Sequence, residues 1–498
     1  MTASPFSRFW QPAGRWLTRK RLLLLAALAL GLWQGLPTLA LLNDGPALVA
    51  LARLAPRLGG LGEPLTLLVL VQNEDELRAT GGYITAVGTL TVHNGRVSHL
   101  DVEDSFAVDD PDLLYPLPPD PLRLYMDAPA WVLRDVNWSA DLPSVAPLAE
   151  ALYTATRPGE FDGVITVDQT ALRFLLDGTG PVYIAALGRL VTANNLIEVM
   201  RTAREPEPGE GVSYEWWLKR KDFMPQIARA VLKKVIWSSW ALVAQSGIRA
   251  LDERHVQLWL KDEEAAAILA ERGWDGALRP GPGDYLMVVE TNVGFNKVNA
   301  HSQALLAYAV DLTDADAPVG RVLAAYANPA QGSLPCEPGP HYGDGRYATL
   351  INRCYWNYLR VYVPDGASLI QAKVNSVPPE WLLLPHAPTG NVEVWPEAST
   401  LQSFGTLMVV PFASQQAIEF EYTLAPGSVT TDGDRTTYRL RLQKQPGTQA
   451  VPLALRVQLP AGSELVLATP RGQLVGTTWT LNVALQRDTD ITLIYRTP

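Results

Sequence analysis

Two kinds of hydrophobic pattern divide the chain near residue 283. Before that point, short continuous apolar runs such as residues 65–71 alternate with segments of helical period such as residues 262–272. Strands alternating with helices are typical of a layered α/β domain. Beyond it, strand-like segments separated by proline and glycine turns follow one another, which is typical of β-sandwiches. We therefore expect an α/β domain at 63–283, a β-rich domain at 284–400 and a C-terminal β-sandwich at 401–498.

Local signals indicate where individual elements begin. The Asn94-Gly95 pair between two strand-like segments predicts a tight hairpin turn. A helix is expected over residues 142–156 with Ser144 as its cap, and another is expected to begin at Asp222 as N-cap. The α/β domain is thus expected to open with a hairpin and to continue with capped helices.

An uncharged apolar segment, Leu22–Leu42, precedes all of these elements. As a helix it would be roughly 31 Å long, enough to cross the hydrocarbon core of a membrane. Basic residues without acids lie on its N-terminal side, which keeps that end in the cytoplasm. A cleaved signal peptide is the alternative, but the segment is long and no A-x-A site follows it. We expect a cytoplasmic tail (1–21), a single-pass signal anchor in the plasma membrane (22–42), a linker helix (43–62) and an extracytoplasmic remainder.

The charge balance bears on the partners of the exported part. The chain has 41 basic and 51 acidic residues, and residues 1–21 hold five of the basic ones, so the remainder has 36 basic and 51 acidic side chains and a net charge of −15. Such a surface does not bind nucleic acid through bulk charge. The two cysteines, Cys336 and Cys354, are expected to form a disulfide that closes a loop of about 18 residues and stabilises the fold by roughly 3 kcal/mol.

The candidate chemistry is charge placed beside buried strands, because the motifs G-x-S-x-G, G-x-x-x-x-G-K and H-E-x-x-H are absent. In "RVSHLDVED", strand alternation puts Asp101 and Glu103 on one face, and Asp104 lies at the strand end. Neighbouring carboxylates raise one another's pKa unless a cation lies among them, and oxygen-rich clusters suit Mg²⁺. These three acids are therefore a candidate Mg²⁺ site, with a solvated sheet edge as the alternative.

Candidate anion-binding residues come from two loops. Arg220 and Lys221 directly precede the helix expected at Asp222, and backbone amides at a helix start favour anions. A basic surface turn is the alternative. In "RDVNWSADLP", Arg134 and Asn137 are concentrated with acids around a tryptophan, which indicates either a tied-down loop or part of a site.

Four stretches resemble a known bacterial family. "QNEDELRATGGYITAVGTLTVHNGRV", "RDVNWSADLP", "FDGVITVD" and "DGTGPV" are similar to motifs of the family called domain of unknown function 4012, over roughly residues 60 to 300. That resemblance implies no established activity.

The order of elements also resembles, more distantly, the LytR–CpsA–Psr family. Those proteins have a cytoplasmic N-terminus, one transmembrane helix and an extracytoplasmic α/β domain. They transfer glycopolymers from polyprenyl-pyrophosphate carriers to the cell wall, using arginines and Mg²⁺. The segment Asp177 to Val182 is similar to that family's "DalGGV". The chain departs from the family at residues 102–105, where "VEDS" lacks the expected arginine. The family's arginine-glutamine pair on a late helix is also absent, and Arg220 lies about a turn upstream of the place where that pair would fall.

This second resemblance implies roles for the candidate residues. The residues expected to hold phosphate or act in catalysis are Arg78, Asp101, Asp104, Arg134 and Arg220. Further ligand contacts are expected from Gly81, Gly82, Asn137 and Lys221, and metal ligands from Asp101, Glu103 and Asp104. The first functional hypothesis is a glycopolymer phosphotransferase of the cell envelope, acting on a polyprenyl-pyrophosphate-linked glycan and a cell-wall polymer. The second is a non-catalytic binding or assembly protein of the envelope, and the sequence leaves both open.

Overall fold

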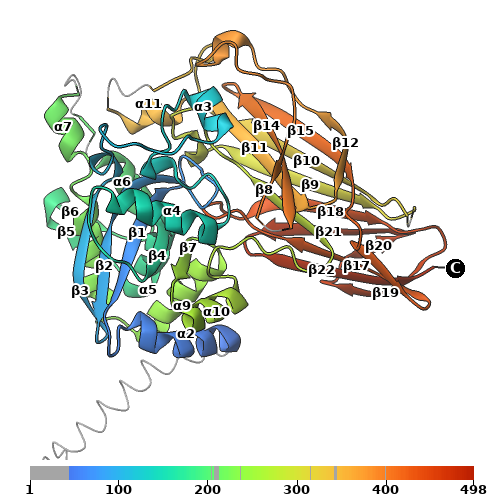
Figure 1. Ribbon diagram of the computed structural model, residues 1–498, viewed down its shortest axis with the longest axis horizontal. Coiled ribbons are helices and arrows are strands. Elements are labelled where there is room, and N and C mark those ends of the chain that lie inside the picture. The colour runs from blue at the N-terminus through green and yellow to red at the C-terminus, as the bar shows by residue number, and fades with distance from the viewer. Residues whose placement is uncertain are drawn as a thin grey trace, which may run out of the picture.

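The structure is a computed structural model that describes residues 44–203, 205–206, 212–235, 237–314, 316–340, 345–398 and 400–497. The expected cytoplasmic tail and signal anchor lie outside these ranges. Among the described residues, no helix is both long and apolar enough to cross a bilayer. An α/β unit extends to residue 283, and a unit built almost entirely of strands follows it (Figure 1).

A five-stranded mixed sheet lies in the middle of the α/β unit, in the order β3-β2-β1-β4-β7. β1 is parallel to β4 and antiparallel to β2, and the outer pairs β2–β3 and β4–β7 are antiparallel. The expected hairpin turn is confirmed, because Asn94 and Gly95 both have positive φ, 50° and 71°, as a two-residue turn between twisted strands requires. The strands are β1 (Leu65–Asn73), β2 (Tyr83–His93), β3 (Arg96–Asp104), β4 (Gly163–Asp168) and β7 (Val256–Leu260).

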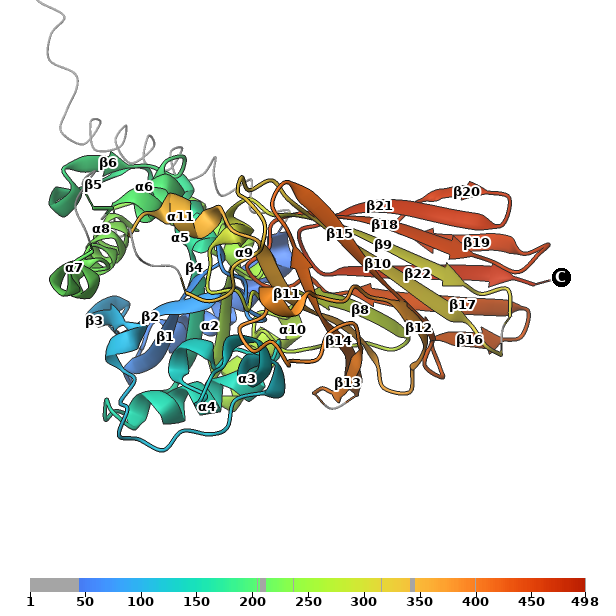
Figure 2. The same ribbon diagram turned by 90° about the horizontal axis from the view of Figure 1, so that it is seen from above.

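Helices cover both faces of this sheet, which explains why β1 is a continuous apolar run. Leu68 and Leu70 lie in a core shared with α4, whereas Leu65 and Leu67 lie in the core that α2, α9 and α10 complete. Figure 2 shows α5, α8 and α9 on one side of the sheet and α3 and α4 on the other. The helices are α2 (Gly45–Leu58), α3 (Asp120–Met126), α4 (Leu142–Thr154), α5 (Gln169–Thr179), α6 (Leu196–Thr202), α7 (Tyr214–Lys219), α8 (Met224–Val235), α9 (Trp240–Asp252) and α10 (Glu263–Arg272). A two-stranded ribbon of β5 (Val182–Ile184) and β6 (Arg189–Val191) packs against α8.

Two helix starts differ from those expected. In α4, Asp141 rather than Ser144 is the N-cap, and the Asp141 carboxylate accepts a hydrogen bond from the Ser144 N–H at 3.1 Å. α8 begins after the expected Asp222 cap, and the separate short helix α7 precedes it. Arg220 and Lys221 therefore lie in a turn between two helices instead of at the start of one.

Two long sheets face each other in the C-terminal part of the chain. One has the order β12-β15-β10-β9-β18-β21-β20, and the other β13-β14-β11-β8-β17-β22-β19, with β16 paired to β17. Side chains from both sheets form one continuous core. The strands are β8 (Asp284–Val289), β9 (Gln303–Asp311), β10 (Val319–Asn328), β11 (Tyr355–Pro364), β12 (Ser368–Lys373), β13 (Glu393–Pro396), β14 (Leu401–Val410), β15 (Ser414–Thr423), β16 (Val429–Asp432), β17 (Arg435–Leu442), β18 (Val451–Gln458), β19 (Glu464–Thr469), β20 (Gln473–Val475), β21 (Thr478–Leu485) and β22 (Thr489–Arg496).

The sandwich consists of two halves fused edge to edge. β8 to β15 form the first half and β16 to β22 the second, and the halves are joined by the parallel pairs β9–β18 and β8–β17. β14 and β15 follow residue 400 yet pair with β11 and β10 of the first half. The chain thus passes into the second half after Thr423, beyond the boundary expected at residue 400, because strand partners are set by pairing and not by sequence order.

A long connection between β10 and β11 leaves the sandwich and returns to it. It contains α11 (Tyr347–Ile351) and is closed by the disulfide Cys336–Cys354, which confirms the expected pairing. Both cysteines are buried in a core shared with α3 of the α/β unit. The connection therefore fastens the sandwich to the α/β unit.

Candidate functional site

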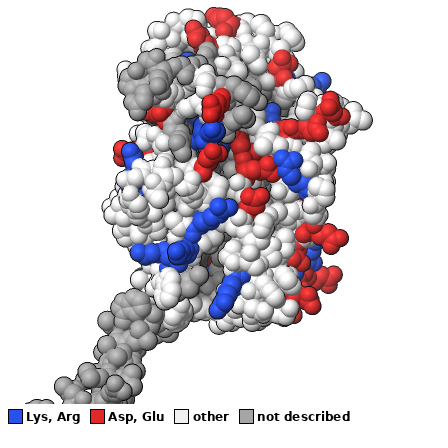
Figure 3. Space-filling model, turned by 90° about the vertical axis from the view of Figure 1, so that its left-hand side faces the viewer, with Lys and Arg blue, Asp and Glu red and all other residues white. Residues whose placement is uncertain are grey.

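A cavity of about 410 Å³ lies between the α/β unit and the loops of the sandwich. The α/β unit supplies the end of β1, the start of β2, the segment after β3, the residues after α3 and the turn between α7 and α8. The sandwich supplies the segment before β9 and the disulfide-closed connection. On this end of the molecule, acidic and basic side chains lie close to one another and do not form a field of one sign (Figure 3). The apolar residues of the cavity include Val71, Phe106, Met126, Ala128, Pro129, Val132, Met200, Phe223, Met224, Phe295 and Leu350.

Three cations surround one aromatic ring in this cavity. The Arg134 guanidinium carbon lies 4.6 Å from the centre of the Phe106 ring. The Arg220 guanidinium carbon and the Lys221 ammonium nitrogen each lie 5.8 Å from the same centre. Phe106 is 39% exposed, so part of its ring faces the cavity. Cations over an aromatic face are attracted by its quadrupole, which draws these three positive groups together despite their mutual repulsion.

Carboxylates position each of these cations. Asp104 accepts from Lys221 Nζ at 2.8 Å and pairs with Arg220 at 3.0 Å, and the Thr85 carbonyl also accepts from Lys221 at 2.6 Å. Arg134 pairs with Asp109. Burial lowers the pKa of Lys221 to about 8, although Asp104 acts in the opposite direction. The cations are thus held in place before any ligand binds.

A second basic group lies toward the sandwich side of the cavity. Arg201 of α6 binds the Asp75 carboxylate through two hydrogen bonds of 2.8 and 2.6 Å, and Tyr347 Oη donates to the same carboxylate at 2.6 Å. Lys297 pairs with Glu76. Arg346 also lines the cavity. α6, α11 and the loop after β1 are thereby tied together around the cavity.

Asp127 differs from the other acids that line the cavity. Within the part of the chain that the structure describes, its carboxylate has no hydrogen-bonding or ionic partner, whereas Glu76 and Asp135 are both ion-paired. Its φ of 48° places it in the left-handed region at the end of α3, a conformation that aspartate tolerates better than most residues. Asp127 is exposed, so its carboxylate is accessible to a ligand and can accept a hydrogen bond from it.

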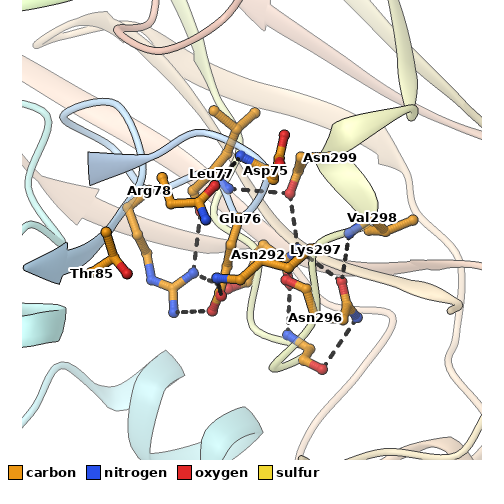
Figure 4. Close-up of polar contacts among 12 residues, drawn as sticks. Asp75, Glu76, Leu77, Arg78, Thr85, Asn292, Asn296, Lys297, Val298 and Asn299 are labelled. Carbon is orange, nitrogen blue, oxygen red and sulfur yellow. Dashed lines mark hydrogen bonds and ion pairs between the residues drawn. The ribbon is translucent and has the colours of Figure 1, made fainter. Parts of the chain in front are cut away.

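Of the residues predicted from the sequence, Arg134, Arg220 and Lys221 line the cavity and Arg78 does not. The Arg78 side chain is 1% exposed. It donates to the Asn292 carbonyl and pairs at 3.1 Å with Glu76 (Figure 4). It also pairs at 3.1 Å with Asp135. Burial lowers the pKa of Arg78, but Glu76 and Asp135 outweigh that effect and raise it above its ordinary value. Arg78 is therefore placed to join the α/β unit to the sandwich.

The predicted Gly81-Gly82 pair and Asn137 also contact protein instead of the cavity. A Cβ on Gly82 would lie 2.4 Å from the Asn73 carbonyl oxygen, and one on Gly447 would lie 1.9 Å from the Gly81 carbonyl oxygen. Asn137 is fully buried and donates to the Gly82 carbonyl at 2.8 Å. The glycines permit close backbone contacts within the protein, between neighbouring loops and between the two units.

The three acids of β3 do not fit a Mg²⁺ site. Glu103 binds Arg157 through two hydrogen bonds of 2.9 Å, Asp104 binds Arg220 and Lys221, and Asp101 is exposed. Successive side chains of a strand point to opposite faces, so Asp104 lies across the sheet from the other two. Within the described residues, no group of three or more His, Cys, Asp or Glu side chains is arranged to hold a metal ion.

Sequence patterns did not single out several residues of the cavity, namely Phe106, Asp127, Arg201, Lys297 and Tyr347. Two features of the sequence could have pointed to Asp127 and Tyr347. They are the irregular proline-rich stretch of residues 109–125, which ends just before Asp127, and the loop between the two cysteines, which contains Tyr347. Long irregular segments within a compact fold are often functional.

Comparison with known proteins gives a family for part of the chain. Residues 62–204 match the family described as "Protein of unknown function (DUF4012)". The matched segment covers less than half of the chain. It runs from β1 to the end of α6 and contributes Phe106, Asp127, Arg134 and Arg201 to the cavity, whereas Arg220 and Lys221 lie beyond it. The resemblance seen in the sequence is confirmed there, and the likeness to the LytR–CpsA–Psr family stays a prediction.

No curated protein matches the chain. Among solved structures, leukotriene A4 hydrolase from Saccharomyces cerevisiae is 6% identical, with a TM-score of 0.22, over 39% of this chain and 29% of that one. The Lin1025 protein from Listeria innocua is 10% identical, with a TM-score of 0.21, over 45% and 85%. Protein gbs0355 from Streptococcus agalactiae is 12% identical, with a TM-score of 0.24, over 43% and 74%. The chain spans less than a third of the yeast hydrolase, and similarity this low supports no conclusion about function.

Proposed function

We propose that the protein is a membrane-anchored, extracytoplasmic protein of the cell envelope that binds a polyprenyl-pyrophosphate-linked glycopolymer in the cavity. The observation that carries this proposal is the group of Arg134, Arg220 and Lys221 around Phe106, in a cavity lined otherwise mainly by apolar side chains. Such a lining suits a ligand that is anionic at one end and apolar at the other. The diphosphate would displace part of the pairing with Asp104, and the first isoprene units would lie against Met126, Phe223 and neighbouring apolar residues.

Binding of farnesyl diphosphate to the full chain tests this proposal. Farnesyl diphosphate should bind more tightly than inorganic pyrophosphate, which lacks the apolar part, and than farnesol, which lacks the charge. Arg220→Gln keeps a donor for Asp104 but removes the charge, so affinity should fall about tenfold, the value of one charge-assisted hydrogen bond. Arg229→Gln is the matched control, because Arg229 is exposed on α8 and does not line the cavity. Equal affinity for farnesol and farnesyl diphosphate would refute the role of the cations.

A phosphotransferase is the second candidate, and the unpartnered Asp127 carboxylate favours it. In this reaction an acceptor hydroxyl attacks the phosphorus next to the glycan, Asp127 accepts the hydroxyl proton, and the bond from that phosphorus to the polyprenyl-phosphate oxygen breaks. The products are a glycan phosphodiester on the acceptor and polyprenyl phosphate. The cavity cations would neutralise the charge that develops on the leaving phosphate.

The exchange Asp127→Asn separates the two candidates. Asparagine has nearly the same shape and also tolerates the left-handed conformation, so the fold and farnesyl diphosphate affinity should be retained. For a transferase, release of polyprenyl phosphate from a lipid-linked glycan should fall by a factor on the order of 100 or more. If the wild-type chain releases none with any wall-polymer acceptor, while still binding the diphosphate, the binding function alone stands.

A further inference from the structure

Large apolar side chains are exposed at the junction of α8 and α9, away from the cavity. Trp237 is 81% exposed and Trp240 is 55% exposed. On the neighbouring ribbon, Tyr183 and Leu190 are paired across β5 and β6, and both are exposed on its outer face. The inner face of the same ribbon is buried against α8, so the outer face is the side left without protein contact in the described chain.

The ribbon and the junction are adjacent, and basic residues accompany them. Lys234 Nζ donates to the Pro181 carbonyl at 3.2 Å, and Ser238 Oγ lies 3.5 Å from the Thr179 carbonyl oxygen. Lys233, at the end of α8, is exposed. Tryptophan and tyrosine with lysine and arginine are the composition of surfaces that lie in the interface of a membrane. Positive side chains in an otherwise acidic protein complement anionic lipid headgroups.

The start of the described chain shares a core with the first turn of α9. Ala241, in the first turn of α9, is buried in the same core as Ala47 and Ala50 of α2. α2 begins at Gly45, directly after the apolar segment Leu22–Leu42 in the sequence. A membrane reached by that segment would therefore be close to Trp240.

We propose that Trp237, Trp240, Tyr183 and Leu190, with Lys233 and Lys234, form a membrane-contact surface for an anionic lipid bilayer. This surface fixes how the α/β unit stands on the membrane. α8 connects it to the cavity, because Phe223 and Met224 at the other end of this 12-residue helix line the cavity. The proposal rests on these surface residues and on the membrane anchor of the proposed function, and it does not depend on the ligand of the cavity.

A single-cysteine label tests the contact in the full chain. Both native cysteines are in the disulfide, so Trp237→Cys carries the one thiol for an environment-sensitive dye. Val475→Cys is the matched control, because Val475 is exposed on β20 in the distal half of the sandwich. In vesicles containing phosphatidylglycerol and a lipid with a brominated acyl chain, the dye at 237 should be blue-shifted and quenched at least twofold more than at 475. Tyr183→Cys on the ribbon gives a second site if the first variant does not fold.

The outcomes of this experiment are distinct. Equal quenching at 237, 183 and 475 would overturn the proposal. Quenching at 237 that is unchanged in vesicles of phosphatidylcholine alone would overturn the role of the basic residues. A blue shift that grows with the density of protein in the vesicles without lipid quenching would indicate a second copy of the chain on this surface, and would also overturn it.

Discussion

At the scale of residues, the charged loop between β1 and β2 is a junction of the fold. Glu74 accepts hydrogen bonds from the first two N–H groups of α5, at 3.1 and 3.0 Å, and Asp75 binds Arg201 and Tyr347. Burial raises the pKa of Glu74 to about 8, with Asp168 and Asp75 adding to the effect. Glu76 and Arg78 complete the set through their own ion pair. The charged side chains of this loop therefore bind α5, α6, α11 and the sandwich.

Removing the buried charge of Arg78 should destabilise the fold. Arg78→Ala removes the fully buried cation from Glu76 and Asp135, which keep only the partly exposed Lys297 and Arg134, and it leaves the Asn292 carbonyl without a donor. Breaking a buried pair on one side costs roughly 3–5 kcal/mol, so the free energy of unfolding in urea should fall by about that amount. Arg123→Ala is the control, because its pair with Asp120 is exposed and should contribute less than about 1 kcal/mol. Equal effects of the two exchanges would contradict the role given to Arg78.

The cavity should bind its anion less well at high pH because of Lys221. Burial lowers the pKa of this lysine to about 8, so it loses its charge within an accessible range. Affinity for farnesyl diphosphate should fall about tenfold between pH 7 and pH 10, the loss of one charge-assisted hydrogen bond. Lys221→Arg keeps the charge throughout and should flatten this dependence in calorimetric titrations. An unchanged pH dependence in that variant would assign the effect to another group.

At the scale of elements, the disulfide-closed connection between β10 and β11 brings part of the sandwich to the cavity. α11 within it positions Tyr347 against Asp75, and the Tyr347 N–H donates to Glu205 at 2.8 Å. The Leu350 carbonyl accepts from the Lys297 N–H at 2.9 Å. The connection thus orders the sandwich side of the cavity as well as joining the two units.

Opening this connection should weaken both stability and binding. Replacing Cys336 and Cys354 together by serine removes the cross-link without leaving a free thiol. The free energy of unfolding should fall by about 3 kcal/mol, from the entropy of an 18-residue loop. Affinity for farnesyl diphosphate should fall as well, because α11 is no longer held against Asp75. A lower melting temperature with unchanged affinity would show that the connection only stabilises the fold.

At the scale of the whole molecule, one buried carboxylate joins the two halves of the sandwich. Asp284 of β8 accepts from Tyr308 Oη of β9 at 2.6 Å and from Tyr438 Oη of β17 at 2.7 Å. Burial raises its pKa to about 6, even though both tyrosines act in the opposite direction. The first half supplies Asp284 and Tyr308 and the second supplies Tyr438, so the halves share a polar centre inside an apolar core.

Asp284 should make the sandwich less stable as the pH rises. Its folded pKa of about 6 lies above its ordinary value of 3.8, so the folded state binds the proton more tightly than the unfolded state. Its stabilising contribution is present in full below pH 4 and is lost as the pH rises through 6, by an amount on the order of 2–3 kcal/mol. Asp284→Asn removes this titration. The difference in unfolding free energy between wild type and variant should decline between pH 4 and 6 and be level above; a flat difference would contradict it.

The sequence by itself determined the local structure of this protein. Apolar runs and helical periods gave the two fold classes, Asn94-Gly95 set the first hairpin, and the single pair Cys336 and Cys354 set the disulfide, because these depend on side-chain period, turn dihedral angles and simple counting. Tertiary structure alone decided that Arg78 is buried and Lys221 lines a cavity, and that β14 and β15 pair with earlier strands. Ion-pair partners and strand neighbours far apart in sequence meet only in the folded chain, and no local pattern carries that information.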